Sequence, residues 1–199
     1  MTQNEKTTPG AGAHTPAPVG RKKKTLAYRM IKLTVDLVIF SMLAAIMFTL
    51  KVVLAGLPNI EPVSLLIIVF TAVYRFRALI PIYVYVMLDG VMQGFSVWWL
   101  PYLYAFTILW AITMLFPKKM PRSVGTVVYP AVCALHGLFF GTLYAPVLIW
   151  VQGFDLTQTI TWLSAGLSFD LLHFFGNLMA GLLILPLSQL LKRLTKNMY

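Results

Sequence analysis

Long apolar runs separated by short polar segments dominate the chain from residue 31 onward. The run Val63–Val73 contains only Ser64 and Thr71 as polar residues, and Leu178–Leu185 contains none. These runs do not alternate between apolar and polar positions, as the strands of a membrane barrel do. In lipid, an uninterrupted apolar run satisfies its backbone hydrogen bonds by forming a helix. The pattern therefore predicts an all-α integral membrane protein.

Six apolar segments are predicted to cross the membrane as one helix bundle. Their approximate bounds are Ile31–Leu54, Glu61–Tyr74, Ala78–Gly94, Ser96–Phe116, Val124–Trp150 and Leu163–Leu191. The second is short for a hydrocarbon core of about 30 Å, and the last two are longer than one crossing needs. We expect one membrane domain over residues 25–195. A disordered basic cytoplasmic tail, rich in Pro, Gly and Thr, is expected over residues 1–24.

The charge distribution predicts the orientation of these segments. The chain is 59% hydrophobic and 11% charged, and its net charge is +10. All Lys and Arg residues except Lys51 lie before the first segment or at its start, after the second, after the fourth, or at the C-terminal end. The positive-inside rule then places both termini in the cytoplasm. This distribution suits a lipid bilayer with anionic headgroups and needs no nucleic-acid partner. Asp36 is expected to pair locally with Lys32, four residues earlier.

A polar stripe follows one face of the last apolar segment. Its members are three or four residues apart and therefore share a helix face: Trp162, Gly166, Asp170, His173, Asn177 and Gly181. Ionisable groups within a membrane segment usually face the bundle interior or a wet cavity. The stripe predicts either a ligand site or a polar contact between helices, and both remain open from the sequence.

Other polar and aromatic residues are expected in the same outer half of the bundle. They are Asn59 and Glu61 in the first outer loop, and His136 and Tyr144 in the fifth segment. Aromatic walls with a few polar groups are typical of small-molecule pockets, and carboxylates beside Trp and Tyr suit a cationic or heterocyclic ligand. Two alternatives stay open: His136 as a satisfied bundle histidine, and Glu61 as the cap of the second segment.

The sequence lacks the common catalytic and nucleotide-binding motifs. It has no Gly-x-x-x-x-Gly-Lys-Ser/Thr loop, no His-Glu-x-x-His, no Gly-x-Ser-x-Gly elbow and no pair of cysteines. We therefore expect binding without a metal, cofactor or catalytic residue. Two alternatives remain. One is a membrane enzyme that uses Asp170 and His173, and the other is a structural membrane protein whose stripe only packs helices.

Three motifs resemble those of the substrate-binding (S) component of energy-coupling factor (ECF) transporters. They are Leu57-Pro-Asn-Ile-Glu-Pro62, His136-Gly-Leu-Phe-Phe-Gly141 with Tyr144-Ala-Pro146, and Phe169-Asp-Leu-Leu-His-Phe-Phe-Gly-Asn177. The resemblance covers about residues 30–195. It implies a multi-pass protein of the bacterial cell membrane that captures a vitamin or similar micronutrient on the outer side. The implied pocket lies between segments four to six and is closed by the loop Ala55–Glu61.

The resemblance also implies partner proteins. An S component docks on a membrane coupling subunit that carries two ATPase subunits, and these partners hydrolyse ATP. Docking in the family uses small residues of the first segment in an Ala-x-x-x-Ala pattern. This chain offers Ser41, Ala45 and Thr49 at that spacing, so it matches the pattern only in part.

Overall fold

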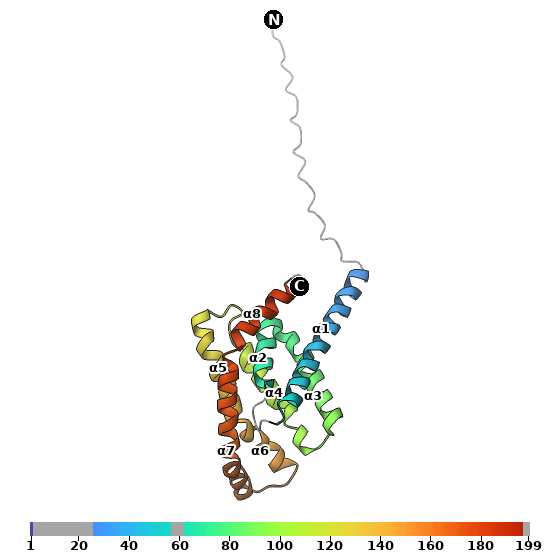
Figure 1. Cartoon of the computed structure of the whole chain (residues 1–199). Coiled ribbons are helices and arrows are strands. Elements are labelled where there is room, and N and C mark those ends of the chain that lie inside the picture. Colours follow the sequence, from blue (N-terminus) through green and yellow to red (C-terminus); the bar gives the residue numbers. More distant parts are fainter. Residues whose placement is uncertain (2–25, 57–61, 197–199) are drawn as a thin grey trace.

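The computed structural model describes Met1, residues 26–56 and residues 62–196, and the regular structure of these residues is helical (Figure 1). Most of the predicted N-terminal tail lies outside the described residues. The elements, with two short 3-10 helices labelled η, are α1 (Leu26–Val53), α2 (Val63–Tyr74), η1 (Arg75–Ala78), α3 (Leu79–Gln93), η2 (Val97–Trp99), α4 (Tyr102–Met114), α5 (Arg122–Leu138), α6 (Phe140–Trp150), α7 (Leu156–Gly181) and α8 (Ile184–Thr195).

Four helical stretches of the described residues are long and apolar enough to cross a membrane. They are Leu26–Val53, Val63–Gln93, Val97–Met114 and Arg122–Trp150. Helices α7 and α8, bent by 49° relative to each other, would together give a fifth. The prediction of a helical membrane protein is therefore confirmed. The six predicted crossings exceed this count, because η1 joins the second and third predicted segments into one stretch.

Within that stretch, α2 runs antiparallel to α1 and lies at the centre of the bundle. Phe40 of α1 packs edge-on against Tyr74 at the end of α2, with ring centroids 5.3 Å apart. Ile46, further along α1, lines a groove together with Leu66, which lies earlier in α2. Nearly all side chains of α2 are buried. A helix that is apolar on all sides is expected in such a central position.

α3 returns beside α1 in the parallel direction, and two ion pairs join α1 to α3 and to the preceding η1. Near the start of α1, Arg77 of η1 donates to Asp36; near its end, Lys51 donates to Asp89 over 2.8 Å. The sequence predicts that Asp36 pairs with Lys32 on the same helix. It does not predict the pairing of Asp36 with Arg77, which lies 41 residues away. Spacing along one helix predicts neighbours on that helix only, so it misses partners on another helix.

The reversal between α2 and α3 occurs at Arg75. Its φ of 55° lies in the left-handed region that residues other than glycine rarely adopt. The Arg75 guanidinium donates to the carbonyls of Met114 and Phe116, over 2.5 and 3.2 Å. These carbonyls lie at the end of α4, where a helix leaves its last acceptors without intrahelical donors. The Trp110 indole donates to the Arg75 carbonyl over 3.2 Å, so α4 holds the reversal in place.

Helices α5 and α7 approach closely because glycines lie at their contact. A Cβ atom on Gly137 would lie 2.7 Å from the carbonyl oxygen of His173. A Cβ atom on Gly181 would lie 2.6 Å from the Cα of Pro130. Small residues allow such close approach of helices in lipid. The contact places the deeper part of the polar stripe, from His173 to Gly181, against α5.

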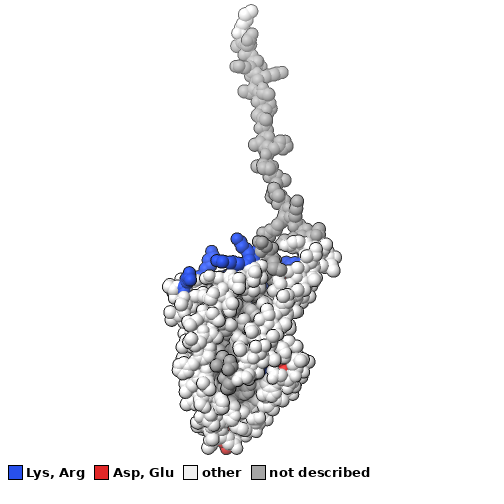
Figure 2. Space-filling view, in the orientation of Figure 1, with Lys and Arg blue, Asp and Glu red and all other residues white. Residues whose placement is uncertain are grey.

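Basic side chains gather at one end of the molecule. Figure 2 shows Lys and Arg at the end where, in Figure 1, α1 begins and α8 ends. Arg122 in the first turn of α5 and Lys192 and Arg193 in the last turn of α8 are basic residues at helix ends. α7 begins at the opposite end of the bundle. The two ends of the bundle therefore differ in charge.

Candidate functional site

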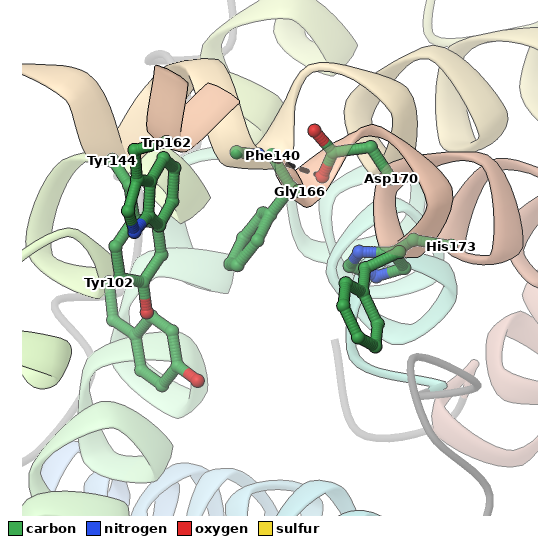
Figure 3. A pocket seen from close by; sticks show the side chains of 9 residues that line it. Tyr102, Phe140, Tyr144, Trp162, Gly166, Asp170 and His173 are labelled. Carbon is green, nitrogen blue, oxygen red and sulfur yellow. Dashed lines mark hydrogen bonds between the residues drawn. The ribbon is translucent and has the colours of Figure 1, made fainter. Parts of the chain in front are cut away.

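A cavity of about 290 Å³ lies between α4, α6 and α7. Its lining is aromatic on several sides and includes one carboxylate and one imidazole: Tyr102, Phe140, Gly141, Tyr144, Trp162, Gly166, Phe169, Asp170 and His173. Figure 3 shows Tyr102, Tyr144 and Trp162 on one side of this cavity and Asp170 and His173 on the other. Of the eight predicted ligand-binding residues, the structure places Asp170, His173, Tyr144 and Trp162 around this cavity.

The start of α7 is set by its N-cap. The Asp155 carboxylate accepts from the backbone N–H of Gln158 over 2.7 Å, and the Gln158 side chain accepts from the N–H of Asp155 over 2.9 Å. This capping box satisfies two donors that a helix start otherwise leaves unpaired. From this start, the helical period brings Trp162, Gly166 and Asp170 to the face that lines the cavity.

Asp170 is half-buried and contacts the start of α6. Helix α5 ends at Leu138 and α6 begins at Phe140, so the N–H of Gly141 lies in a first turn, where it has no intrahelical acceptor. Asp170 Oδ1 accepts from this N–H over 3.1 Å. A Cβ atom on Gly141 would overlap the carboxylate, so a larger residue here would displace the Asp170 side chain. The helix N-terminus favours a negative charge at this position.

His173 lies one turn deeper than Asp170 and forms part of the cavity wall. Its side chain is buried, at 8% exposure, and its ring packs edge-on against Phe140 with centroids 5.2 Å apart. The ring thus lies between the cavity and the bundle core. Its position suits contact with a ligand that reaches the bottom of the cavity.

The aromatic side of the cavity is held by hydrogen bonds and ring contacts. Tyr144 and Trp162 lie nearly parallel, with an interplanar angle of 21° and centroids 6.2 Å apart. The Tyr144 hydroxyl donates to the carbonyl of Trp98 over 2.7 Å. Tyr102 packs against Phe140 with centroids 6.2 Å apart. These contacts orient the ring faces of three helices around one space.

His136 lies outside the lining of this cavity and has two protein partners. Its Nε2 lies 3.3 Å from the carbonyl of Ala105, and its Nδ1 lies 2.9 Å from the hydroxyl of Ser64. A carbonyl only accepts, so Nε2 carries the proton and the Ser64 hydroxyl donates to Nδ1. This pattern matches the alternative of a satisfied bundle histidine.

Asn177 also lies outside the cavity lining, one turn beyond His173. It is 1% exposed, and neither its Nδ2 nor its Oδ1 has a hydrogen-bond partner among the described residues. A buried amide without partners is rare, because burial without hydrogen bonds costs about 1–3 kcal/mol. Asn59 and Glu61, the other two predicted ligand-binding residues, lie outside the described residues.

Five lining residues are absent from the eight predicted ligand-binding residues: Tyr102, Phe140, Gly141, Gly166 and Phe169. Two of them could have been found. Gly166 lies on the predicted stripe, and Phe140 lies four residues after His136 and before Tyr144 on one helix face. Tyr102 belongs to α4, and no local pattern connects α4 with α6 and α7.

A buried ion pair lies behind the Tyr102 wall. Lys51 Nζ lies 2.8 Å from Asp89 Oδ2, and Gln93 also donates to the Asp89 carboxylate. The same ammonium lies 5.0 Å from the centroid of the Tyr102 ring and 5.6 Å from that of Trp98. The end of α1 therefore contacts an aromatic residue that lines the cavity.

Comparison of the chain with protein-family models, curated proteins and solved structures finds no match. Among the described residues, no group of three or more His, Cys, Asp or Glu side chains is placed to hold a metal ion. The arrangement defines an aromatic cavity with a carboxylate and an imidazole, inside an apolar helical bundle. Aromatic walls with a few polar groups are typical of small-molecule pockets.

Proposed function

We propose that the chain is the substrate-capture subunit of an ATP-driven uptake transporter for a vitamin-like micronutrient in the bacterial cell membrane. The observation that carries this proposal is the aromatic cavity with Asp170 and His173 in an apolar bundle. Small-molecule sites are concave, largely apolar and equipped with a few placed polar groups. A bundle without a nucleotide-binding motif needs a partner to couple uptake to ATP, so a separate coupling and ATPase module delivers the ligand.

The proposed topology has six crossings and both termini in the cytoplasm. The reversal at Arg75 supports a division of Val63–Gln93 into two segments. The sixth crossing is α7 with α8, which the 49° bend divides. The basic end of the bundle supports a cytoplasmic position for the start of α1 and the end of α8 (Figure 2). In this topology, the cavity opens in the outer half.

The proposed docking face for the membrane coupling subunit lies on α1. Ser41, Ala45 and Thr49 are all exposed, on a helix whose buried side chains lie on its other face. Small residues at this spacing allow another helix to approach closely in lipid. The two ATPase subunits bind to the coupling subunit and not to this chain.

The test is gentle purification of the tagged full chain from its native membranes, followed by native mass spectrometry. We expect co-purification of a larger membrane subunit and two ATPase subunits, and retention of a small molecule. Ala45→Leu should reduce the ATPase yield severalfold, because leucine blocks close approach at the docking face. Ala111→Leu, at an exposed position of α4, is the matched control and should leave the yield unchanged.

Each competing function predicts a different result for the purified chain. A membrane enzyme that uses Asp170 and His173 would turn over a substrate as the isolated chain, and His173→Ala would abolish turnover. A structural protein would carry neither ligand nor ATPases. Repeated purification of a clean chain without ATPases, in several mild detergents, would refute the transporter proposal.

A further inference from the structure

We propose that the cavity selects a small organic cation with a planar ring. The inference rests on the proposed capture function and names the chemical class of its ligand. Its basis is the joint occurrence of an aromatic lining, a carboxylate in that lining, and the absence of Lys and Arg from the lining that the described residues form.

Asp170 differs from the other described carboxylates in its partners. Asp36 and Asp89 each form an ion pair with a basic side chain of a neighbouring element. Asp155 caps α7 at the end of the bundle. Among the described residues, the hydrogen-bond donor to Asp170 is the backbone N–H of Gly141, and no ion pair is formed. A carboxylate in apolar surroundings gains from an opposite charge, which a cationic ligand would supply.

The one basic side chain beside the cavity wall is already neutralised in the described structure. Lys51 contacts the Tyr102 ring, but its ammonium pairs with Asp89 over 2.8 Å. His173 is the other titratable nitrogen group at the wall, and it packs against Phe140. An anionic ligand would therefore meet the Asp170 carboxylate without a fixed positive charge to oppose it.

The aromatic faces suit a cation better than a neutral ring. A positive charge within about 6 Å of a ring centroid is attracted by the ring quadrupole, and Trp is the best partner. Trp162 and Tyr144 lie nearly parallel, and Tyr102 and Phe140 complete the wall. The volume of about 290 Å³ lies just below the usual range of about 300–1,000 Å³ for ligand pockets. It favours a ligand of one or two rings over a large cofactor.

The test uses the full chain in lipid nanodiscs and three probes of similar shape. The ring-N-methylated nicotinamide cation is the positive probe, m-toluamide is its neutral isostere, and m-toluate is an anion of the same outline. Binding is measured by isothermal titration calorimetry and by the shift in thermal unfolding midpoint. The variant Asp170→Asn removes the charge with little change in shape. Asp155→Asn is the matched control, because asparagine also caps a helix.

The cation should bind roughly tenfold or more tightly than m-toluamide and should raise the unfolding midpoint. Asp170→Asn should weaken cation binding by roughly tenfold or more, since it removes one member of a charge pair, and should leave m-toluamide binding unchanged. Asp155→Asn should alter neither. If Asp170→Asn does not fold, Trp162→Leu replaces it. Trp162 is 36% exposed and lies outside the buried core, and its loss should weaken cation binding more than amide binding.

Three outcomes overturn the cation proposal: m-toluamide or m-toluate binds as tightly as the cation, Asp170→Asn leaves cation binding intact, or no probe binds. Tight binding of the amide or the anion would leave the capture function standing and reject only the ligand class. Loss of the capture function is a separate result, recognised by the absence of a coupling subunit and ATPases on purification.

Discussion

The ion pair between Lys51 and Asp89 provides the sharpest test of how this bundle is held together. Asp89 is fully buried and Lys51 is 9% exposed, and their charged atoms are 2.8 Å apart. At this distance the attraction is about 6 kcal/mol for an effective dielectric constant of about 20. Desolvation of both ions offsets much of this attraction, so the net contribution of the pair is far smaller.

Removal of one charged partner should lower the free energy of unfolding more than removal of both. Lys51→Met leaves the Asp89 charge buried without its counter-ion, which costs about 3–5 kcal/mol. The loss of cation–π contacts with Tyr102 and Trp98 adds about 0.5–1 kcal/mol each. Lys51→Met combined with Asp89→Asn removes both charges and should recover most of the loss, to within about 1–2 kcal/mol of the parent chain.

The assay is reversible unfolding in mixed dodecylmaltoside and sodium dodecyl sulfate micelles, followed by circular dichroism. Lys118→Met is the matched control, since Lys118 is exposed between α4 and α5, and its effect should stay within about 0.5 kcal/mol. The double-mutant cycle then gives the coupling energy, which should be at least about 2 kcal/mol. A Lys51→Met effect equal to that of Lys118→Met, or a double variant as unstable as the single one, would refute the argument.

Three further predictions concern the contacts of α5 and α7. Gly137→Ala should lower the free energy of unfolding by about 1–3 kcal/mol, because its Cβ would lie 2.7 Å from a backbone carbonyl of α7. Gly166→Ala is the control, because a Cβ atom there has open space, and it should lower the thermal midpoint by no more than a degree or so. Asn177→Leu should be neutral or stabilising in thermal unfolding, because it removes two buried polar atoms without partners. Ser64→Ala should cost about 1–3 kcal/mol by leaving His136 Nδ1 without its donor, and a loss below 0.3 kcal/mol by the same unfolding assay would contradict this bond.

The helical class and several boundaries follow from the apolar runs. The predicted segments Glu61–Tyr74 and Ala78–Gly94 lie close to α2 and α3, because two arginines interrupt the apolar sequence between them. The last predicted segment, Leu163–Leu191, was less accurate. α7 begins earlier, at Leu156, and a capping box of Asp155 and Gln158 could have indicated this start.

The break between α7 and α8 is less clearly marked in the sequence than the start of α7. The apolar run Leu178–Leu185 passes through it without interruption, and only Pro186, in the first turn of α8, marks a new helix start. The reversal at Arg75 depends on carbonyls at the end of α4, so its geometry could not be read from neighbouring residues.

In the candidate site too, residues on one helix face could be predicted from the sequence, whereas residues brought in by other helices could not. Trp162, Asp170 and His173 are correctly grouped on one face because helical spacing alone brings them together. Tyr102 is added by side-chain contacts of α4 with α6, such as that of Tyr102 with Phe140, and these depend on the packing of distant segments. Asn177 shares the predicted stripe but lies one turn too deep for the cavity, since the stripe continues into the α5 contact after His173.

Lys51 lies between the proposed docking face on α1 and the proposed ligand cavity. It lies in the last turn of α1, the helix with the proposed docking face of Ser41, Ala45 and Thr49. Its ammonium also contacts Tyr102, a wall of the cavity, over 5.0 Å. A ligand that displaces the Tyr102 ring would change the surroundings of a buried charge, and electrostatic energies change steeply with distance at low dielectric. Lys51 is therefore the side chain through which α1 contacts both the buried carboxylate of α3 and the wall of the cavity.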